Sequence, residues 1–251
     1  MPCVEATEIG KIVEMEERHW WYRERRALLA RSLRRLAVPP GRALDIGAAG
    51  GGNTRVLKAH GWQPVVCDYS VAGTAVSHER GLDTVRADAC ALPLATSCLD
   101  LVVAFDILEH IERDDVAAAE IVRVLRPGAT ALIAVPADMR LWSAHDEAVE
   151  HVRRYDRASL RAVIEKAGLV IDELTSWNVL LRPVAAWRRR RSTGSDLTDL
   201  SPIVNTGLTA VIMLERYLPV SSLPGVSLML RAHRPVVSAV RPPGDVDGVL
   251  A

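Results

Sequence analysis

The sequence has little of what would assign it to an unusual class of protein. Its 251 residues carry 31 basic and 31 acidic side chains, and the only lysines are Lys11, Lys58 and Lys166. The formal net charge of zero provides no overall positive field to attract nucleic acid and no negative field to repel it. With 49% apolar and 25% charged residues, the composition is that of a folded globular protein and excludes wholesale disorder.

Cysteine pairs and long apolar runs are absent as well. The four cysteines (Cys3, Cys67, Cys90 and Cys98) show no CxxC pair and no spacing typical of metal ligands, so we expect reduced thiols and no metal site. No apolar run approaches the roughly 18 residues of a membrane span. The N-terminal segment is rich in glutamate, the wrong charge for a secretory signal. These absences predict a soluble, cytoplasmic protein.

What the sequence does contain is an alternation of strand-like and helical segments. The predicted strands are 42–46, 64–67, 84–87, 99–105, 130–135, 170–175 and 225–231. The predicted helices are 4–36, interrupted or continuous, then a helix capped by Asn53 or Thr54 that runs to His60, and 71–80, 114–125 (capped by Asp114 or Asp115), 156–166, 178–191 and 203–218. The first five strands and their helices predict an α/β fold, in which a parallel sheet carries helices on both faces.

The loop after the first strand carries the strongest chemical signal. The segment DIGAAGGGNT (45–54) joins a strand to a helix, and its small residues allow a tight turn and close approach of a ligand to the backbone. A dinucleotide-binding loop normally has no carboxylate two residues before its first glycine, whereas Asp45 stands there. A carboxylate at this place repels a pyrophosphate and attracts a cation such as a sulfonium or an ammonium.

Carboxylates also end the next three strands. Asp68 ends the second strand, where it can accept hydrogen bonds from both hydroxyls of a ribose. Asp88 ends the third strand, where it can accept from an exocyclic amine, and Asp106 ends the fourth. Ligands of doubly wound sheets bind outside the carboxyl ends of the strands, so four acidic residues at successive ends predict a binding site. Any one of them alone is also explained by the capping of a helix or turn.

With these motifs the chain resembles the class I S-adenosylmethionine-dependent methyltransferases of small-molecule type, close to methyltransferase type 11. The motifs that carry the resemblance are Asp45-x-Gly47-x-Ala49-x-Gly51, Asp68, Ala87-Asp88-Ala89, Leu108-Glu109-His110-Ile111 and Leu125-Arg126-Pro127-Gly128. They cover residues 40–136, with a weaker likeness in the last strand. The resemblance implies a Rossmann-like, doubly wound, mostly parallel seven-stranded sheet with an antiparallel edge strand. Ala49 replaces the family's usual glycine, and its methyl group is expected to be tolerated where the backbone angle φ is negative.

The resemblance also implies S-adenosyl-L-methionine as the cofactor and a role for each matched residue. Gly47, Ala49 and Gly51 would lie against its amino-acid part, with Asp45 near its ammonium group. Asp68 would accept from the ribose hydroxyls. The remaining predicted cofactor-binding residues are Tyr69, then Asp88 and Ala89 at the adenine, and Phe105 and Asp106 at the methionine part.

The segment after the fifth strand concentrates titratable groups. The run LWSAHDEAVEHVRRY (141–155) resembles a pattern found in a subset of small-molecule methyltransferases. The candidate catalytic residues are His145, Asp146, His151 and Tyr155 from this run and His110 after the fourth strand. His145 beside Asp146 is a candidate oriented base for a protonated nucleophile. The alternative is a structural lid, in which Asp146 pairs with Arg153 or Arg154 and Tyr155 packs; His110, in a motif shared across the family, is weighted towards structure.

Four parts of the chain follow from this interpretation. Residues 1–39 are predicted to form an N-terminal helical cap over the cofactor cleft, 40–136 the cofactor-binding core, 137–234 the acceptor-binding segment and the rest of the sheet, and 235–251 a flexible tail. Residues 192–202 and the tail are expected to be mobile, because they are polar or rich in proline and glycine. The arginine run 188–191 suits a solvated helix end, with an anionic acceptor as the alternative.

We therefore predict an S-adenosylmethionine-dependent methyltransferase that methylates oxygen or nitrogen of a small-molecule acceptor. A nucleic-acid partner is not expected, because the chain has no basic stripe and no appended nucleic-acid module. Two other functions stay open: a non-catalytic subunit that binds S-adenosylmethionine, and a nicotinamide-dependent oxidoreductase, which Asp45 argues against. The sequence leaves the acceptor and the oligomeric state open.

Overall fold

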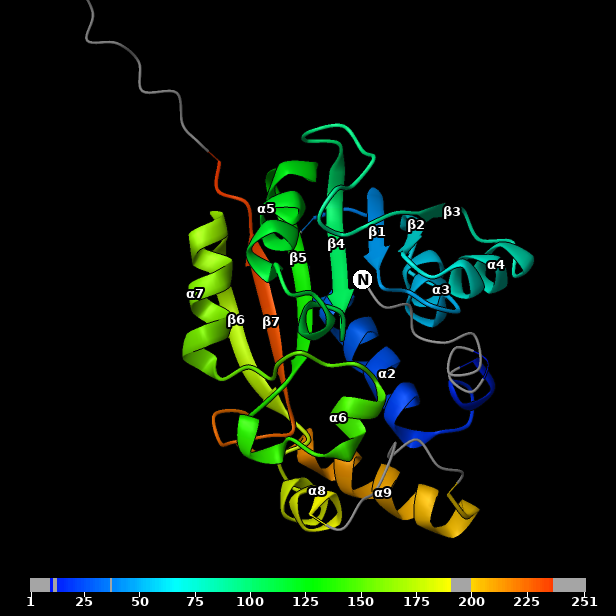
Figure 1. Cartoon of the computed structure of the whole chain (residues 1–251), viewed down its shortest axis with the longest axis vertical. Coiled ribbons are helices and arrows are strands. Elements are labelled where there is room, and N and C mark those ends of the chain that lie inside the picture. Colours follow the sequence, from blue (N-terminus) through cyan, green and yellow to red (C-terminus); the bar gives the residue numbers. More distant parts are fainter. Residues whose placement is uncertain (1–9, 11–12, 37, 191–199, 237–251) are drawn as a thin grey trace, which may run out of the picture.

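A computed structural model describes residues 10, 13–36, 38–190 and 200–236 of the chain. These residues form a seven-stranded sheet with helices on both faces (Figure 1). The strands are β1 (Arg42–Ile46), β2 (Gln63–Asp68), β3 (Thr84–Arg86), β4 (Leu99–Phe105), β5 (Leu125–Pro136), β6 (Val170–Trp177) and β7 (Ser227–His233). The helices are α2 (Trp20–Arg34), α3 (Gly52–Ala59), α4 (Val71–Glu79), α5 (Asp114–Val124), α6 (Ala144–Ala148), α7 (Arg157–Ala167), α8 (Arg182–Arg189) and α9 (Pro202–Glu215), with short 3-10 helices at Leu108–His110 and Met139–Leu141.

The sheet confirms the predicted mostly parallel α/β fold. Its strand order is β3-β2-β1-β4-β5-β7-β6, and β1 to β5 pair in parallel. The antiparallel strand is β7, which pairs with β5 on one side and with β6 on the other. The antiparallel strand therefore lies inside the sheet and not at its edge, where it was expected; β6 forms the edge.

Strand β4 shows why the sheet is buried on both faces. Leu101 and Val103 point to one face and pack in the same cluster as Leu29 of α2 and Leu57 of α3. The alternate residue Val102 points to the other face, where it packs with residues of α5 and α7. Side chains alternate between the faces of a strand, so a strand covered on both sides is a continuous apolar run. This explains why the LVVAF run predicts β4 with the bounds that the structure has.

Some predicted element ends are wrong for local reasons. Helix α3 takes Gly51, not Asn53 or Thr54, as its N-cap residue, in a left-handed conformation with φ of 77°. Helix α5 has Arg113 as its N-cap and no capping side chain. Helix α8 begins at Arg182 rather than at 178, since Asn178 has a positive φ of 61°. Of the segments expected to be mobile, residues 192–199 and 237–251 lie outside the described residues.

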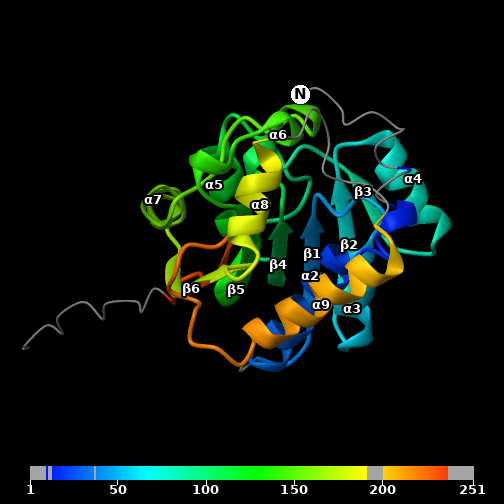
Figure 2. The ribbon, with the colours of Figure 1, turned by 90° about the horizontal axis from the view of Figure 1, so that it is seen from below.

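The start of helix α2 meets helix α9 beside the carboxyl ends of the parallel strands. The backbone N–H of Trp20, at the start of α2, donates to Asn205 of α9 at 2.8 Å, and the Asn205 amide donates to the carbonyl of Arg18 at 3.0 Å. Trp20 also packs with Trp177 and Ile212 in a small apolar cluster. Figure 2 shows α8 and α9 in front of this end of the sheet. No helix in the described part of the chain is long and apolar enough to cross a membrane.

Candidate functional site

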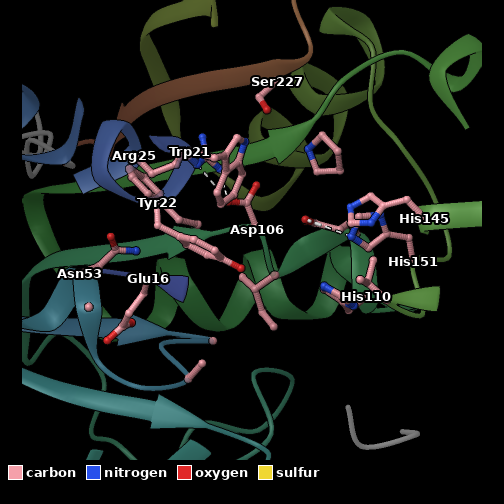
Figure 3. Close-up of a pocket in the computed structure, with 18 of the residues that line it drawn as sticks. Glu16, Trp21, Tyr22, Arg25, Asn53, Asp106, His110, His145, His151 and Ser227 are labelled. Carbon is pink, nitrogen blue, oxygen red and sulfur yellow. Dashed lines mark hydrogen bonds and ion pairs between the residues drawn. The ribbon is translucent and has the colours of Figure 1, made fainter. Parts of the chain in front are cut away.

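The carboxyl ends of β1 to β4 open into a cavity of about 460 Å³. Its walls come from the loops after these strands, from α2, from the segment around α6 and from α8. In Figure 3, His110, His145 and His151 lie together at one end, and Glu16 and Asn53 lie at the other. Trp21, Arg25 and Asp106 lie between the two ends (Figure 3). A doubly wound sheet binds its ligands at this place.

The loop after β1 forms one end of the cavity, and three of its residues have a left-handed backbone. The φ angles are 71° at Gly47, 44° at Ala49 and 77° at Gly51. A Cβ at Gly51 would lie 2.2 Å from a methyl carbon of Leu82, so only glycine fits there. The methyl group of Ala49 was expected to be tolerated at a negative φ, but the angle is positive. An L residue in this conformation costs roughly 1–2 kcal/mol.

Asp68, which ends β2, holds this strained loop in place. One oxygen of its carboxylate accepts the backbone N–H of Ala49 and the other accepts that of Ser70, both at 2.8 Å. The hydroxyl of Ser77 donates to the carbonyl of Ala49 at 2.6 Å. Burial raises the pKa of Asp68, against the opposing effect of these backbone hydrogen bonds. Asp68 lines the cavity, as does its neighbour Tyr69.

Asp45 lies behind the loop, at 1% exposure, and does not line the cavity. One of its oxygens accepts the hydroxyl of Thr54 at 2.6 Å, and its Oδ1 atom has no hydrogen-bond partner among the described residues. Burial raises the pKa of Asp45 to about 7, the Thr54 hydrogen bond opposes the change, and the charge of Asp68 adds to it. The carboxyl group is therefore poised between its neutral and charged forms near neutral pH.

The middle of the cavity contains an ion pair that sequence reasoning missed. Arg25 of α2 is 3% exposed and donates through Nε to Asp106 at 3.0 Å. Its guanidinium lies 4.9 Å from the ring of Trp21, 5.2 Å from that of Phe105 and 5.3 Å from that of Trp177. Asp106 itself has a positive φ of 53°. The available signal was the spacing of Trp21 and Arg25, which places both on the same face of a helix.

At the other end, Asp146 binds His151. Asp146 is fully buried; its carboxylate meets Nδ1 of His151 at 2.8 Å and accepts from Nε of Arg154 at 2.7 Å. It also forms a capping box with Ser143 at the start of α6. Of the two pairings expected for a lid, the one with Arg154 is found, whereas Arg153 pairs with Asp114. The contact with His151, which orients that ring, was not anticipated.

Two groups from the Leu108–His110 turn complete this end of the cavity. The ring of His110 lies 4.7 Å from that of His151 and nearly perpendicular to it. Burial lowers the pKa of His110 to about 4, and the neighbouring His151 adds to the effect. Glu109 is 1% exposed, and neither of its carboxylate oxygens has a hydrogen-bond partner among the described residues. Burial and the charge of Asp106 raise its pKa well above the ordinary value. Glu109 was not predicted as a site residue, although it precedes His110 in the LEHI motif.

The chain is similar in sequence to known methyltransferases. A family described as "Methyltransferase domain" matches residues 44–133. A probable S-adenosylmethionine-dependent methyltransferase of Mycolicibacterium smegmatis is 26% identical over 166 residues, which are 63% of this chain and 63% of that protein. The chain is therefore similar to S-adenosylmethionine-dependent methyltransferases, and it spans less than two thirds of the length of this relative.

Solved structures share the fold of this chain. A Haloferax volcanii protein, solved in complex with the Trm112 methyltransferase activator, matches with a TM-score of 0.63 at 21% identity, over 90% of this chain and 95% of that one. Phosphoethanolamine N-methyltransferase 2 of Haemonchus contortus, solved with S-adenosyl-L-methionine, matches with a TM-score of 0.59 at 20% identity, over 85% of this chain and 53% of that one.

Most of the predicted cofactor-binding residues line the cavity. The predicted residues that line it come from the ends of all four strands and surround one continuous space: Gly47, Ala49, Asp68, Tyr69, Ala89, Phe105 and Asp106. Asp45, Gly51 and Asp88 stand just outside the lining. Asp88 accepts the backbone N–H of Cys90 at 2.8 Å, which shapes the turn that presents Ala89.

The predicted catalytic residues divide into two groups. His110, His145 and His151 line the cavity, whereas Asp146 and Tyr155 do not. The hydroxyl of Tyr155 donates to the carboxylate of Asp114 at 2.7 Å, and burial together with this contact raises its pKa. Tyr155 therefore packs behind the cavity wall, as in the lid interpretation.

Proposed function

We propose that this protein transfers a methyl group from S-adenosylmethionine to an oxygen or nitrogen atom of a small-molecule acceptor. The observation that carries the proposal is the cavity itself. It runs from the glycine-rich loop and Asp68 at one end to His110, His145 and His151 at the other (Figure 3). A cofactor-binding half and a half with candidate acid–base groups thus share one space.

The first half would hold the cofactor. Gly47 and Ala49 would lie along its amino-acid part, and the carboxylate of Asp68, next to Tyr69, would accept from its ribose hydroxyls. Ala89 presents a backbone N–H for the adenine. The bound cofactor supplies an activated methyl group on a positively charged sulfur. The protein therefore has chiefly to align the acceptor and exclude water.

The second half would receive the acceptor and its proton. We assign the base to His145, which lines the cavity with its ring 6.2 Å from that of His151. Both ring nitrogens of His151 face carboxylates, Asp146 at 2.8 Å and Glu109 at 3.8 Å, so neither is directed at an acceptor alone. His110, with its pKa lowered to about 4, is a weak base. Asp146 would act as a positioning residue by fixing the ring of His151.

The walls of the cavity favour a small acceptor. Trp20, Trp21 and Tyr22 of α2 and Leu181 beside α8 line it, so apolar and aromatic side chains form part of a concave wall. Such a site suits a ligand that enters and is enclosed. The Haemonchus contortus enzyme of the same fold is named for a small acceptor, phosphoethanolamine.

The test has two stages. Calorimetry with S-adenosylmethionine measures cofactor binding, and a library of small hydroxyl and amine compounds is then screened for release of S-adenosylhomocysteine by mass spectrometry. We expect binding and at least one compound that gains a single methyl group. Binding without turnover on any compound would support the alternative, a non-catalytic subunit. Absence of binding would refute the proposed function.

A further inference from the structure

We propose that Glu109, His110 and His151 bind a divalent transition-metal ion, Zn²⁺ by preference, at the acceptor end of the cavity. Each of the three residues offers one ligand atom, and these atoms all lie within 4.8 Å of one another. Two imidazoles and a carboxylate are a ligand set that suits zinc and similar ions. The metal site itself does not depend on methyl transfer.

The spacing is close to that of a bound site. Ligands at about 2.1 Å from a tetrahedral zinc ion are about 3.4 Å apart. Nε2 of His151 and Oε1 of Glu109 are 3.8 Å apart, so a shift of a few tenths of an ångström would bring both into range. The rings of His110 and His151 are nearly perpendicular, with centres 4.7 Å apart, which lets the two imidazoles face a common point from different directions.

Glu109 supplies the second, independent observation. It is 1% exposed, and neither oxygen accepts a hydrogen bond from any described residue. Burying a carboxyl group without hydrogen-bond partners costs free energy, and a metal ion can compensate for this cost. The nearby guanidinium groups serve other carboxylates, since Arg25 pairs with Asp106 and Arg154 with Asp146.

His151 is already prepared for a metal. Its Nδ1 atom is 2.8 Å from Asp146, which leaves Nε2 turned towards Glu109. A carboxylate behind an imidazole is the usual second support of a metal-bound histidine, because it fixes the ring and raises its basicity. Asp146 is in turn held by Arg154 and by the capping box of α6, so the support is rigid.

Three protein ligands leave one position of a tetrahedral ion open, as in catalytic zinc sites. All three residues line the cavity, so this position faces the acceptor. This step rests on the proposed function: an acceptor hydroxyl bound to the metal would lose its proton more readily, and His145 is on the same wall to receive it. The cysteine spacing gave no sign of such a site, because its ligands are histidine and glutamate from separate segments.

Cobalt(II) is a suitable probe, since tetrahedral coordination gives it strong visible absorption. The full-length protein is stripped with a chelator and titrated with Co²⁺, and then with Zn²⁺. We expect one Co²⁺ per chain, with bands that Zn²⁺ abolishes by displacement. Glu109→Gln and His151→Ala are expected to weaken Co²⁺ binding at least about 10-fold, and Asp146→Asn, which removes only the support, by roughly 10–100-fold.

His233→Ala is the matched control. His233 also places Nδ1 2.8 Å from an aspartate, Asp172, but this pair lies on β6 and β7 outside the cavity. We expect its removal to leave the Co²⁺ titration unchanged. Absence of the bands, or equal affinity in wild type, Glu109→Gln and His151→Ala, would overturn the metal site.

Calorimetry with S-adenosylmethionine on the same samples separates the two proposals. Cofactor binding by the metal-free wild type without any Co²⁺ binding refutes the metal site alone. Co²⁺ binding without cofactor binding refutes the proposed function alone. If His151→Ala does not fold by circular dichroism, Glu109→Gln, which keeps the shape of the side chain, decides the result.

Discussion

Replacing Asp45 with asparagine is expected to stabilise the protein, and to do so more strongly as the pH rises. Asp45 is buried behind the loop after β1, where it accepts one hydrogen bond from Thr54 and its second oxygen has no partner among the described residues. Asparagine keeps an oxygen for the Thr54 hydroxyl but cannot ionise. The variant therefore removes the cost of a buried charge and preserves the shape.

The size of the effect follows from the pKa of this carboxyl group. Burial raises it from 3.8 to about 7 in the folded state. Because the pKa of Asp45 is higher in the folded state than in the unfolded state, its ionisation favours unfolding. The free energy of unfolding is therefore highest below pH 4 and falls as the pH rises to 7. A difference of about three pH units corresponds to about 4 kcal/mol at the upper limit, and to roughly 2–3 kcal/mol between pH 5 and pH 8.

Urea unfolding of both proteins at several values between pH 5 and pH 8, without cofactor, measures this difference. Asp138→Asn is the control, because the Arg140 side chain lowers the pKa of Asp138 to about 2. The stabilisation that Asp138 provides is complete from about pH 5 upwards, so we expect Asp138→Asn to lower the free energy of unfolding by the same amount from pH 5 to pH 8. A free-energy gain for Asp45→Asn that does not change with pH would refute the reasoning about the buried charge.

Three further substitutions test the loop, the cofactor site and the base. Asp68→Ala is expected to raise the dissociation constant for S-adenosylmethionine about 10- to 100-fold, measured by calorimetry. An unchanged dissociation constant would refute the assignment of Asp68 to the ribose. His145→Ala is expected to lower turnover roughly 10²–10⁴-fold at nearly unchanged cofactor affinity, and full maximal turnover across pH 6–9 would remove this residue from catalysis. Ala49→Gly is expected to raise the free energy of unfolding by about 1 kcal/mol, since glycine tolerates the positive φ; a loss of stability would contradict the strain.

Features carried by local sequence could be predicted well. The predicted helix 156–166 matches α7 to within a residue, because the Asp156 carboxylate caps its start and the left-handed Gly168 ends it, each within one turn. Strand β4 and the acidic strand ends were likewise predictable, since each depends on a short stretch of chain. The parallel direction of the first five strands was predictable from their alternation with helices.

Features that depend on distant residues could not be predicted. The pair of Arg25 and Asp106 joins positions 81 residues apart, and nothing in either local sequence indicates the other. His145 was predicted to be oriented by Asp146 because the two residues are adjacent in the sequence. In the structure the carboxylate of Asp146 instead contacts His151, five residues further on. Glu109 was overlooked because only the folded protein shows that its carboxylate is buried without a hydrogen-bond partner among the described residues.

The place of β7 in the sheet has a consequence for synthesis on the ribosome. Strand β6 pairs only with β7 among the described strands, and β7 is the last of them to be made. Strand β6 therefore has no sheet partner until residue 233 has left the exit tunnel, and its unpaired edge is exposed in the meantime. The contact between α2 and α9 also waits for the C-terminal part. Ribosome-bound chains that stop after β5 would have the parallel sheet but not the cavity walls that α8 and α9 provide. The cavity is therefore among the last features of the nascent chain to form.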